Sequence, residues 1–154
     1  MSTQKRFISQ KEALEILKGG DVGILSTVSP DGQPYGVPVH YCFSAEENCI
    51  FFHCATSGQK IDNILFSPRV SFLVVGQCEV VPEKITTRYA SAMVFGKAEI
   101  AKDPREKAEK LRALCVRFAP DTPWAMDESL LKTCGDSLIV KINIDRVTGK
   151  RNRP

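Results

Sequence analysis

A hairpin signal in the first third of the chain constrains the fold more than any other feature. Val22–Val28 is a mostly apolar run, and Ser29-Pro30-Asp31-Gly32 directly after it has the composition of a tight turn. Residues 35–43 then alternate, which puts two sets of side chains on opposite faces: Tyr35, Val37, Val39, Tyr41 and Phe43 on one, and Gly36, Pro38, His40 and Cys42 on the other. Strands joined by so short a turn pair in the antiparallel sense.

The rest of the chain continues this pattern with helices inserted between strands. A capping box of Ser9 and Glu12 predicts a first helix that stops at Gly19-Gly20. Strands are predicted at 49–54, 70–75, 91–100 and 137–144, with a candidate short strand at 79–81 and an irregular polar stretch at 82–89. Helices are predicted after residue 58 to about Phe66, from Asp103 through Phe118, and at 127–134. In the helix after Asp103, three basic residues are expected on the solvent side: Lys107, Lys110 and Arg112.

This order predicts a mainly β (α+β) fold rather than the βαβ alternation of a doubly wound sheet. A split antiparallel β-barrel of about six strands with flanking helices removes most sheet edges. Pro38 cannot donate to a strand ladder, so it marks either an edge or a place where something other than a strand lies against the backbone. The length of 154 residues indicates one domain, residues 1–154.

Composition excludes several classes of function. The net charge of +3 is too small to indicate nucleic-acid binding, and the basic cluster at 150–153 is expected to be solvated. No stretch approaches the roughly 18 apolar residues of a membrane helix, and the polar N-terminus lacks a signal core, so a cytoplasmic protein is expected. The six cysteines form no C-x-x-C pair, which predicts free thiols and no metal site.

One stretch, residues 50–64, has the composition of a binding site. It begins as a strand, breaks in Thr56-Ser57-Gly58 and restarts as a helix through Ile61 and Ile64. A strand that leads into a helix N-terminus presents free backbone N–H groups, and Lys60 in the first turn adds a cation, which suits a phosphate or another compact anion. The alternative is an ordinary junction with a solvated lysine. Neither the P-loop nor the dinucleotide-binding glycine motif is present.

The chain resembles the pyridoxamine 5'-phosphate oxidase-related flavoproteins, and within them the nitroimidazole-resistance-like branch. The resemblance covers roughly residues 7–151. It is carried by the order and spacing of several short stretches: residues 23–28, 31–39, 52–55, 58–60, 62–64, 80–84, 94–98 and 147–151, together with Tyr89.

The resemblance implies a homodimer that binds FMN at its interface. It implies that the strand Val37, Pro38, Val39 and His40 runs under the isoalloxazine ring. It assigns the phosphate to the junction residues His53, Cys54, Ala55 and Lys60, and it places Ser91 near the ring, from the partner chain. Two departures argue against pyridoxamine phosphate oxidation itself: Gln59 stands where that enzyme has an arginine, and the chain ends without its Arg- and His-containing substrate segment.

The leading hypothesis is therefore an FMN-dependent oxidoreductase of a small molecule, for which nitroaromatic reduction is one candidate reaction. The chemistry would belong to the flavin, with His40 or His53 as candidate proton donors or as structural histidines. The alternative is a non-enzymatic flavin or haem binding or sensing module on the same barrel, and a deazaflavin in place of FMN is a third reading.

Overall fold

The computed structural model describes residues 6–121 and 136–154. The helices are α1 (Gln10–Gly19), α2 (Gln59–Phe66) and α3 (Pro104–Phe118), with a 3-10 turn η2 at Pro82–Lys84. The strands are β1 (Phe7–Ile8), β2 (Val22–Val28), β3 (Pro34–His40), β4 (Cys42–Ser44), β5 (Cys49–Ala55), β6 (Arg69–Val81), β7 (Thr86–Ile100) and β8 (Ser137–Asn152). The helix expected at 127–134 lies outside the described residues.

The strands form one antiparallel sheet that curls into a split barrel, as the sequence predicts. Their order is β3-β2-β6-β7-β8-β5-β4, with β1 added to β8. The two end strands, β3 and β4, are consecutive in the chain and are separated only by Tyr41, so the sheet wraps round on itself without closing. The sheet has eight strands against about six expected, because β1 and β4 are short pieces that the pattern does not separate.

The barrel interior is filled by the alternate residues of each strand and by one face of α1. Tyr41 is fully buried, packs edge-on against Phe72 with ring centroids 5.0 Å apart, and its hydroxyl donates to the Leu17 carbonyl. The predicted capping box is confirmed, since the Glu12 N–H donates to Ser9 Oγ at 3.3 Å and the Ser9 N–H donates to Glu12 Oε2 at 3.1 Å. The predicted hairpin of β2 and β3 is confirmed with Leu25 opposite Val37.

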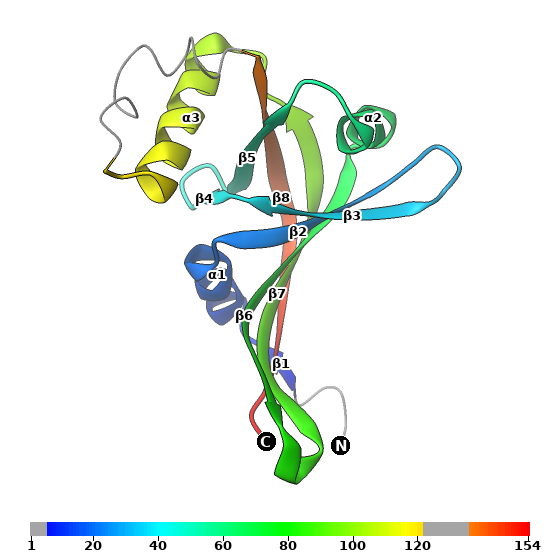
Figure 1. Cartoon of the computed structure of the whole chain (residues 1–154), viewed down its shortest axis with the longest axis vertical. Helices are drawn as coiled ribbons and strands as arrows, with labels where there is room; N and C mark the ends of the chain where they lie inside the picture. Colours follow the sequence, from blue (N-terminus) through cyan, green and yellow to red (C-terminus); the bar gives the residue numbers. More distant parts are fainter. Residues whose placement is uncertain (1–5, 122–135) are drawn as a thin grey trace.

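The region from residue 76 to residue 90 differs from the prediction. Instead of a short strand and an irregular stretch, β6 and β7 continue as one long hairpin that projects away from the barrel (Figure 1), with Cys78 opposite Tyr89 and Glu79 opposite Arg88. Most of this arm is exposed on both faces, so its sequence lacks the apolar alternation that marks a half-buried strand.

The C-terminal strand also differs from the prediction. It was expected to end at residue 144, with a solvated basic tail, but β8 runs on to Asn152 and pairs with β7 over this length. Arg151 forms an ion pair with Glu12 of α1 at 2.7 Å, and buried Asn152 donates to the Thr87 carbonyl at 2.6 Å. Backbone pairing and these contacts hold the end of β8 in the sheet, although its basic composition is typical of a solvated C-terminal tail.

Helix α3 begins at the predicted cap, with the Arg105 N–H donating to Asp103 Oδ1 at 2.8 Å. The expectation that Lys110 faces solvent is wrong. Its side chain is only 4% exposed, its ammonium is paired with Glu47, and it lies 4.8 Å from the centroid of the Phe51 ring. The lysine reaches over the second apolar cluster, which includes Cys49, Phe51, Leu111 and Leu114.

Candidate functional site

The best candidate for a ligand site is formed by the end of β5, the turn after it and the start of α2, residues 53–60, called here the β5–α2 junction. Gly58 is the N-cap of α2, with φ of 126°, a conformation that side chains rarely adopt, and no side chain caps the helix. The Gly58 carbonyl accepts from the N–H groups of Ile61 at 2.9 Å and Asp62 at 3.1 Å. The N–H groups of Gln59 and Lys60 thus have no partner within the helix and can serve an anion.

The junction is held in place by the buried face of α2. Asn63 is 1% exposed, and its Nδ2 donates to Thr27 Oγ1 of β2 at 2.9 Å. Ile61 and Ile64 on the same face are buried in the core. A satisfied buried amide between two buried isoleucines fixes the helix against β2, so the uncapped N-terminus has a defined position.

Lys60 lies close to the end of β5. Burial raises the pKa of the Cys54 thiol, and the nearby Lys60 ammonium opposes that rise. The thiol is buried in the barrel core, and a raised pKa disfavours the thiolate that a nucleophile would need. Only the backbone of Cys54 remains for a ligand at the junction, whereas His53, Ala55 and the loop that follows are exposed.

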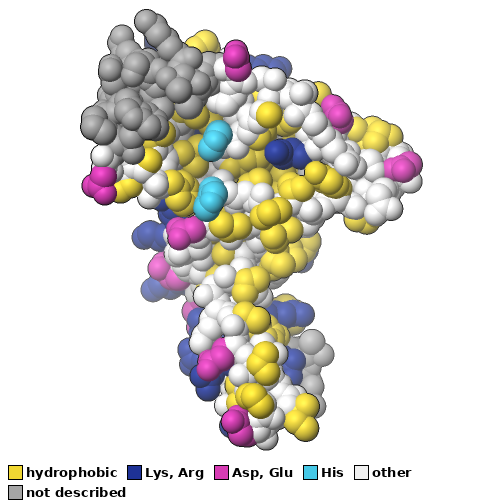
Figure 2. Space-filling model, in the orientation of Figure 1, with side chains coloured by type: hydrophobic (Ala, Val, Ile, Leu, Met, Phe, Trp, Pro, Cys, Tyr) yellow, Lys and Arg dark blue, Asp and Glu magenta, His cyan; other side chains and the backbone are white. Residues whose placement is uncertain are grey.

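The outward faces of β3 and β5 place the two histidines together on one face of the molecule (Figure 2). His40 and His53 are both exposed, and these are the only histidines in the sequence. Within β3, the side chains of Val37 and Val39 pack against the core, while Pro38 and His40 point outward. Because β3 is the end strand of the sheet, its outer backbone edge is available to a ligand, which agrees with the edge reading of Pro38.

The end of α3 adds a wall that the sequence does not reveal. The Phe118 ring packs against His40 with ring centroids 5.0 Å apart and an interplanar angle of 58°. Arg117 fixes this helix end, since its Nη2 donates to the Gly20 carbonyl at 2.7 Å and lies 3.2 Å from Asp21 Oδ1. Phe118 matches the apolar period of the helix, and no local signal distinguishes it from a core residue.

Ser91 does not lie at the junction. It is on β7, in a groove of about 380 Å³ over the outer faces of β6, β7 and β8, opposite Lys150 in register. None of the residues that line this groove belongs to the β5–α2 junction. Eight of the nine predicted residues therefore belong to β3 and the junction, and Ser91 belongs to a second surface.

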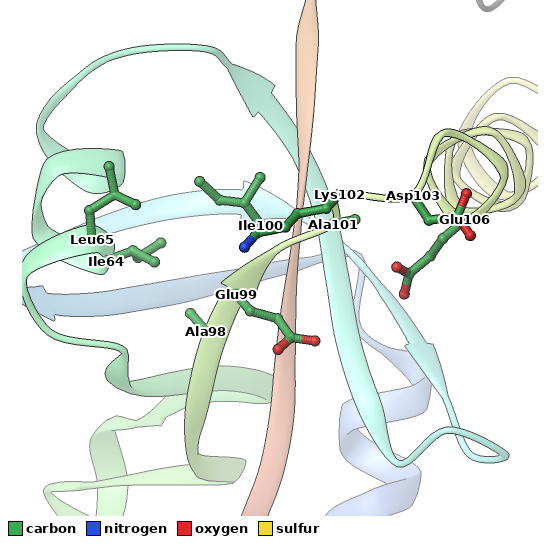
Figure 3. Close-up of a pocket in the computed structure, with 9 residues that line it drawn as sticks. All are labelled: Ile64, Leu65, Ala98, Glu99, Ile100, Ala101, Lys102, Asp103 and Glu106. Carbon is green, nitrogen blue, oxygen red and sulfur yellow. The ribbon is translucent and has the colours of Figure 1, made fainter.

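A larger pocket of about 600 Å³ lies between α2 and the start of α3, over the end of β7 (Figure 3). Its carboxylates are already engaged: Lys141 lies 3.2 Å from Glu99 and 2.7 Å from Glu106. Asp103 caps α3. Apart from Lys102, the polar side chains that line the pocket are thus already engaged in ion pairs or helix capping, and we assign it no chemistry.

Other classes of site find no support in the described part of the chain. Residues 6–121 and 136–154 contain no group of three or more side chains that could hold a metal ion. None of the helices described is long and apolar enough to cross a membrane.

Solved structures with the same fold include several flavin-binding proteins. A candidate 5-nitroimidazole antibiotic resistance protein of Bacteroides thetaiotaomicron is 22% identical, with a TM-score of 0.77, covering 94% of this chain and 85% of that one. A hypothetical protein of Mycobacterium tuberculosis is 20% identical, with a TM-score of 0.80, covering 99% and 91%. An FAD and haem binding protein of Mycobacterium smegmatis is 20% identical, with a TM-score of 0.78, covering 95% and 72%.

At these identities the structural likeness establishes the fold and not the ligand. No curated protein matches the sequence. The family model of pyridoxamine 5'-phosphate oxidase matches residues 9–151, a range that includes the β5–α2 junction and most of the barrel and of the groove that contains Ser91. The chain belongs to the pyridoxamine 5'-phosphate oxidase family.

Proposed function

We propose that the protein is an FMN-dependent oxidoreductase that acts on a small molecule, with the flavin phosphate at the β5–α2 junction. The observation that carries this proposal is the uncapped N-terminus of α2, where two N–H groups have no partner within the helix and Lys60 stands in the first turn. This donor set fits one compact dianion. The flavin-binding proteins among the structural neighbours support the same ligand class.

Different residues would bind the phosphate and the ring of the flavin. The junction N–H groups and Lys60 would hold the phosphate, and the outer edge of β3 at Pro38 would lie along the ring. Bound FMN would supply the redox chemistry. His40 and His53 are exposed on the same face as this edge, so either can pass a proton to a substrate placed there. The Phe118 ring against His40 limits the space on one side.

Gln59 supports an activity other than pyridoxamine phosphate oxidation. It is exposed at the first position of α2 and contributes no charge beside Lys60. Charge-assisted contacts are about twice as strong as neutral ones, so this junction holds a phosphate with less charge than the oxidase does.

A half-reaction experiment distinguishes an enzyme from a flavin carrier. The purified chain is loaded with FMN, reduced chemically without oxygen and mixed with a nitroaromatic acceptor. We expect protein-bound reduced flavin to be reoxidised faster than free reduced FMN at the same concentration. Reoxidation no faster than in free solution would support a binding or storage module instead, which the FAD and haem binding neighbour makes the second candidate.

We also propose that the protein is a homodimer with the flavin at its interface. The hairpin of β6 and β7 exposes Val75 (53%), Val80 (69%) and Ile85 (96%), and apolar side chains on a projecting arm favour a protein contact. A twofold pair is the commonest closed assembly. Sedimentation equilibrium should give twice 17.1 kDa, and a monomer that still binds FMN would contradict the shared site.

A further inference from the structure

The groove that contains Ser91 combines charged and apolar side chains in an arrangement that suits a small ligand. Outward-facing side chains of two paired strands line it: Ser91, Met93 and Phe95 from β7, and Arg146, Thr148 and Lys150 from β8. The pairs are in register, with Ser91 opposite Lys150, Met93 opposite Thr148, and Phe95 opposite Arg146. A cation therefore stands at each end, and an apolar centre lies between them.

Both cations rest on aromatic rings. The Arg146 guanidinium carbon lies 4.3 Å from the centroid of the Phe95 ring, and Lys150 Nζ lies 5.0 Å from the centroid of the Phe7 ring. A guanidinium over a ring face still has its N–H donors available at its edge, where they can meet a carboxylate. The rings also order the two long side chains, which lowers the entropy cost of binding an anion.

Neither cation is neutralised by the protein among residues 6–121 and 136–154. The ion pairs found there involve Arg88, Lys110, Arg117, Lys141 and Arg151. Arg151 next to Lys150 turns to the opposite face of β8 and meets Glu12. The hydroxyls of Ser91 and Thr148 likewise have no hydrogen-bond partner in the part of the chain that the structure describes.

The centre of the groove is apolar. Met93 and Leu73 are adjacent in register on β7 and β6, and both line the groove. Its volume of about 380 Å³ lies within the range of small-molecule sites. A simple phosphate would leave this surface unused, whereas an anion with a flat apolar body would cover it.

We propose that this groove binds an organic anion, an aromatic carboxylate in chemical class, with its acid group on Arg146 and its apolar body over Met93 and Leu73. If the anion is also the substrate, that assignment rests on the proposed function, because the anion is then the molecule that the flavin reduces or oxidises. The anion-binding part stands on the groove alone.

The test compares an acid with its neutral ester. Binding of 4-nitrobenzoate and of methyl 4-nitrobenzoate to the full chain is measured by equilibrium dialysis, with and without FMN. We expect the acid to bind more tightly than the ester, and Arg146→Gln to weaken the acid about tenfold while leaving the ester unchanged. Lys97→Gln, which removes a charge from β7 outside the groove, should change neither affinity.

Two outcomes would overturn the proposal: equal binding of acid and ester by the wild-type chain, or an Arg146→Gln variant that retains full affinity for the acid. Loss of dimerisation in Arg146→Gln, with no binding of the acid by the wild-type chain, would also overturn it and assign the groove to a protein contact. Titration with FMN in the same samples keeps the two proposals separate. An acid that binds a chain without affinity for FMN would support the groove while contradicting the proposed flavin function.

Discussion

The Lys60→Ala variant is expected to bind FMN about 10- to 100-fold more weakly than the wild-type chain. The substitution removes one charge-assisted contact to the phosphate, worth roughly 1.5–3 kcal/mol, and each 1.4 kcal/mol is about a factor of ten in affinity. The uncapped N–H groups of α2 remain, so binding should weaken without being abolished. Fluorescence titration of apo-protein with FMN measures the change.

Riboflavin and a second lysine provide the controls. Riboflavin lacks the phosphate, so its affinity should be nearly the same in both proteins. Lys11 is the second residue of α1, as Lys60 is of α2, but the N-terminus of α1 is closed by the Ser9–Glu12 capping box. Lys11→Ala should therefore leave FMN affinity unchanged. An equal loss in both variants would indicate general surface potential, and no loss in Lys60→Ala would exclude the lysine from the site.

The Glu47→Ala variant is expected to lower the free energy of unfolding by roughly 1–3 kcal/mol. It leaves the buried Lys110 ammonium without its partner, but Glu47 itself is 38% exposed, so water can reach the vacated position. Lys110 is 4% exposed, and among residues 6–121 and 136–154 its ammonium pairs with Glu47 and lies 4.8 Å from the centroid of the Phe51 ring. Lys110→Met keeps most of the volume and removes the charge, so it should cost much less. Chemical denaturation of both single variants and the double variant measures the cycle.

The double variant tests whether the unpaired Lys110 charge causes the loss of stability. With both charges absent, Glu47→Ala together with Lys110→Met should be more stable than Glu47→Ala alone. Additive losses would mean that the pair does not interact energetically.

The same pair predicts an acid dependence. The hydrogen bond from Lys110 is the main cause of a lowered pKa of the Glu47 carboxyl in the folded protein. A carboxyl with a lowered folded pKa contributes stability above its unfolded value near 4.5, and this contribution is lost as the pH falls through the folded pKa. The stability difference between wild type and Glu47→Ala should therefore shrink below about pH 4.5.

The sequence predicts the parts of the fold that local chemistry decides. The apolar run of β2, the alternation of β3 and the capping box of α1 depend on neighbours in the chain, and all three elements are confirmed. The β6–β7 arm was missed because its strands are held by backbone pairing and not by burial of alternate side chains. Lys110 was misplaced because its partner, Glu47, lies 63 residues away, and helical period alone puts a lysine in solvent.

In the candidate site, too, features set by neighbouring residues are predictable from the sequence, and contacts between distant segments are not. The uncapped N-terminus of α2 and its lysine are visible in consecutive residues, and the structure has the geometry that they predict. The contact of Phe118 with His40 and the groove of Ser91, Arg146 and Lys150 join residues from distant segments. Such contacts depend on strand order and on helix placement, which no local pattern specifies.

Whether this chain is an FMN-binding flavoprotein can be read from the chromophore of the purified protein. Its visible absorption spectrum is recorded, and the molecule released on denaturation is identified by mass spectrometry, with an FMN titration of any colourless fraction. We expect a flavin spectrum with FMN as the released molecule, or saturable binding of FMN at one site per chain by colourless protein. A protein that releases only haem, or a colourless protein that fails to bind FMN, would contradict it.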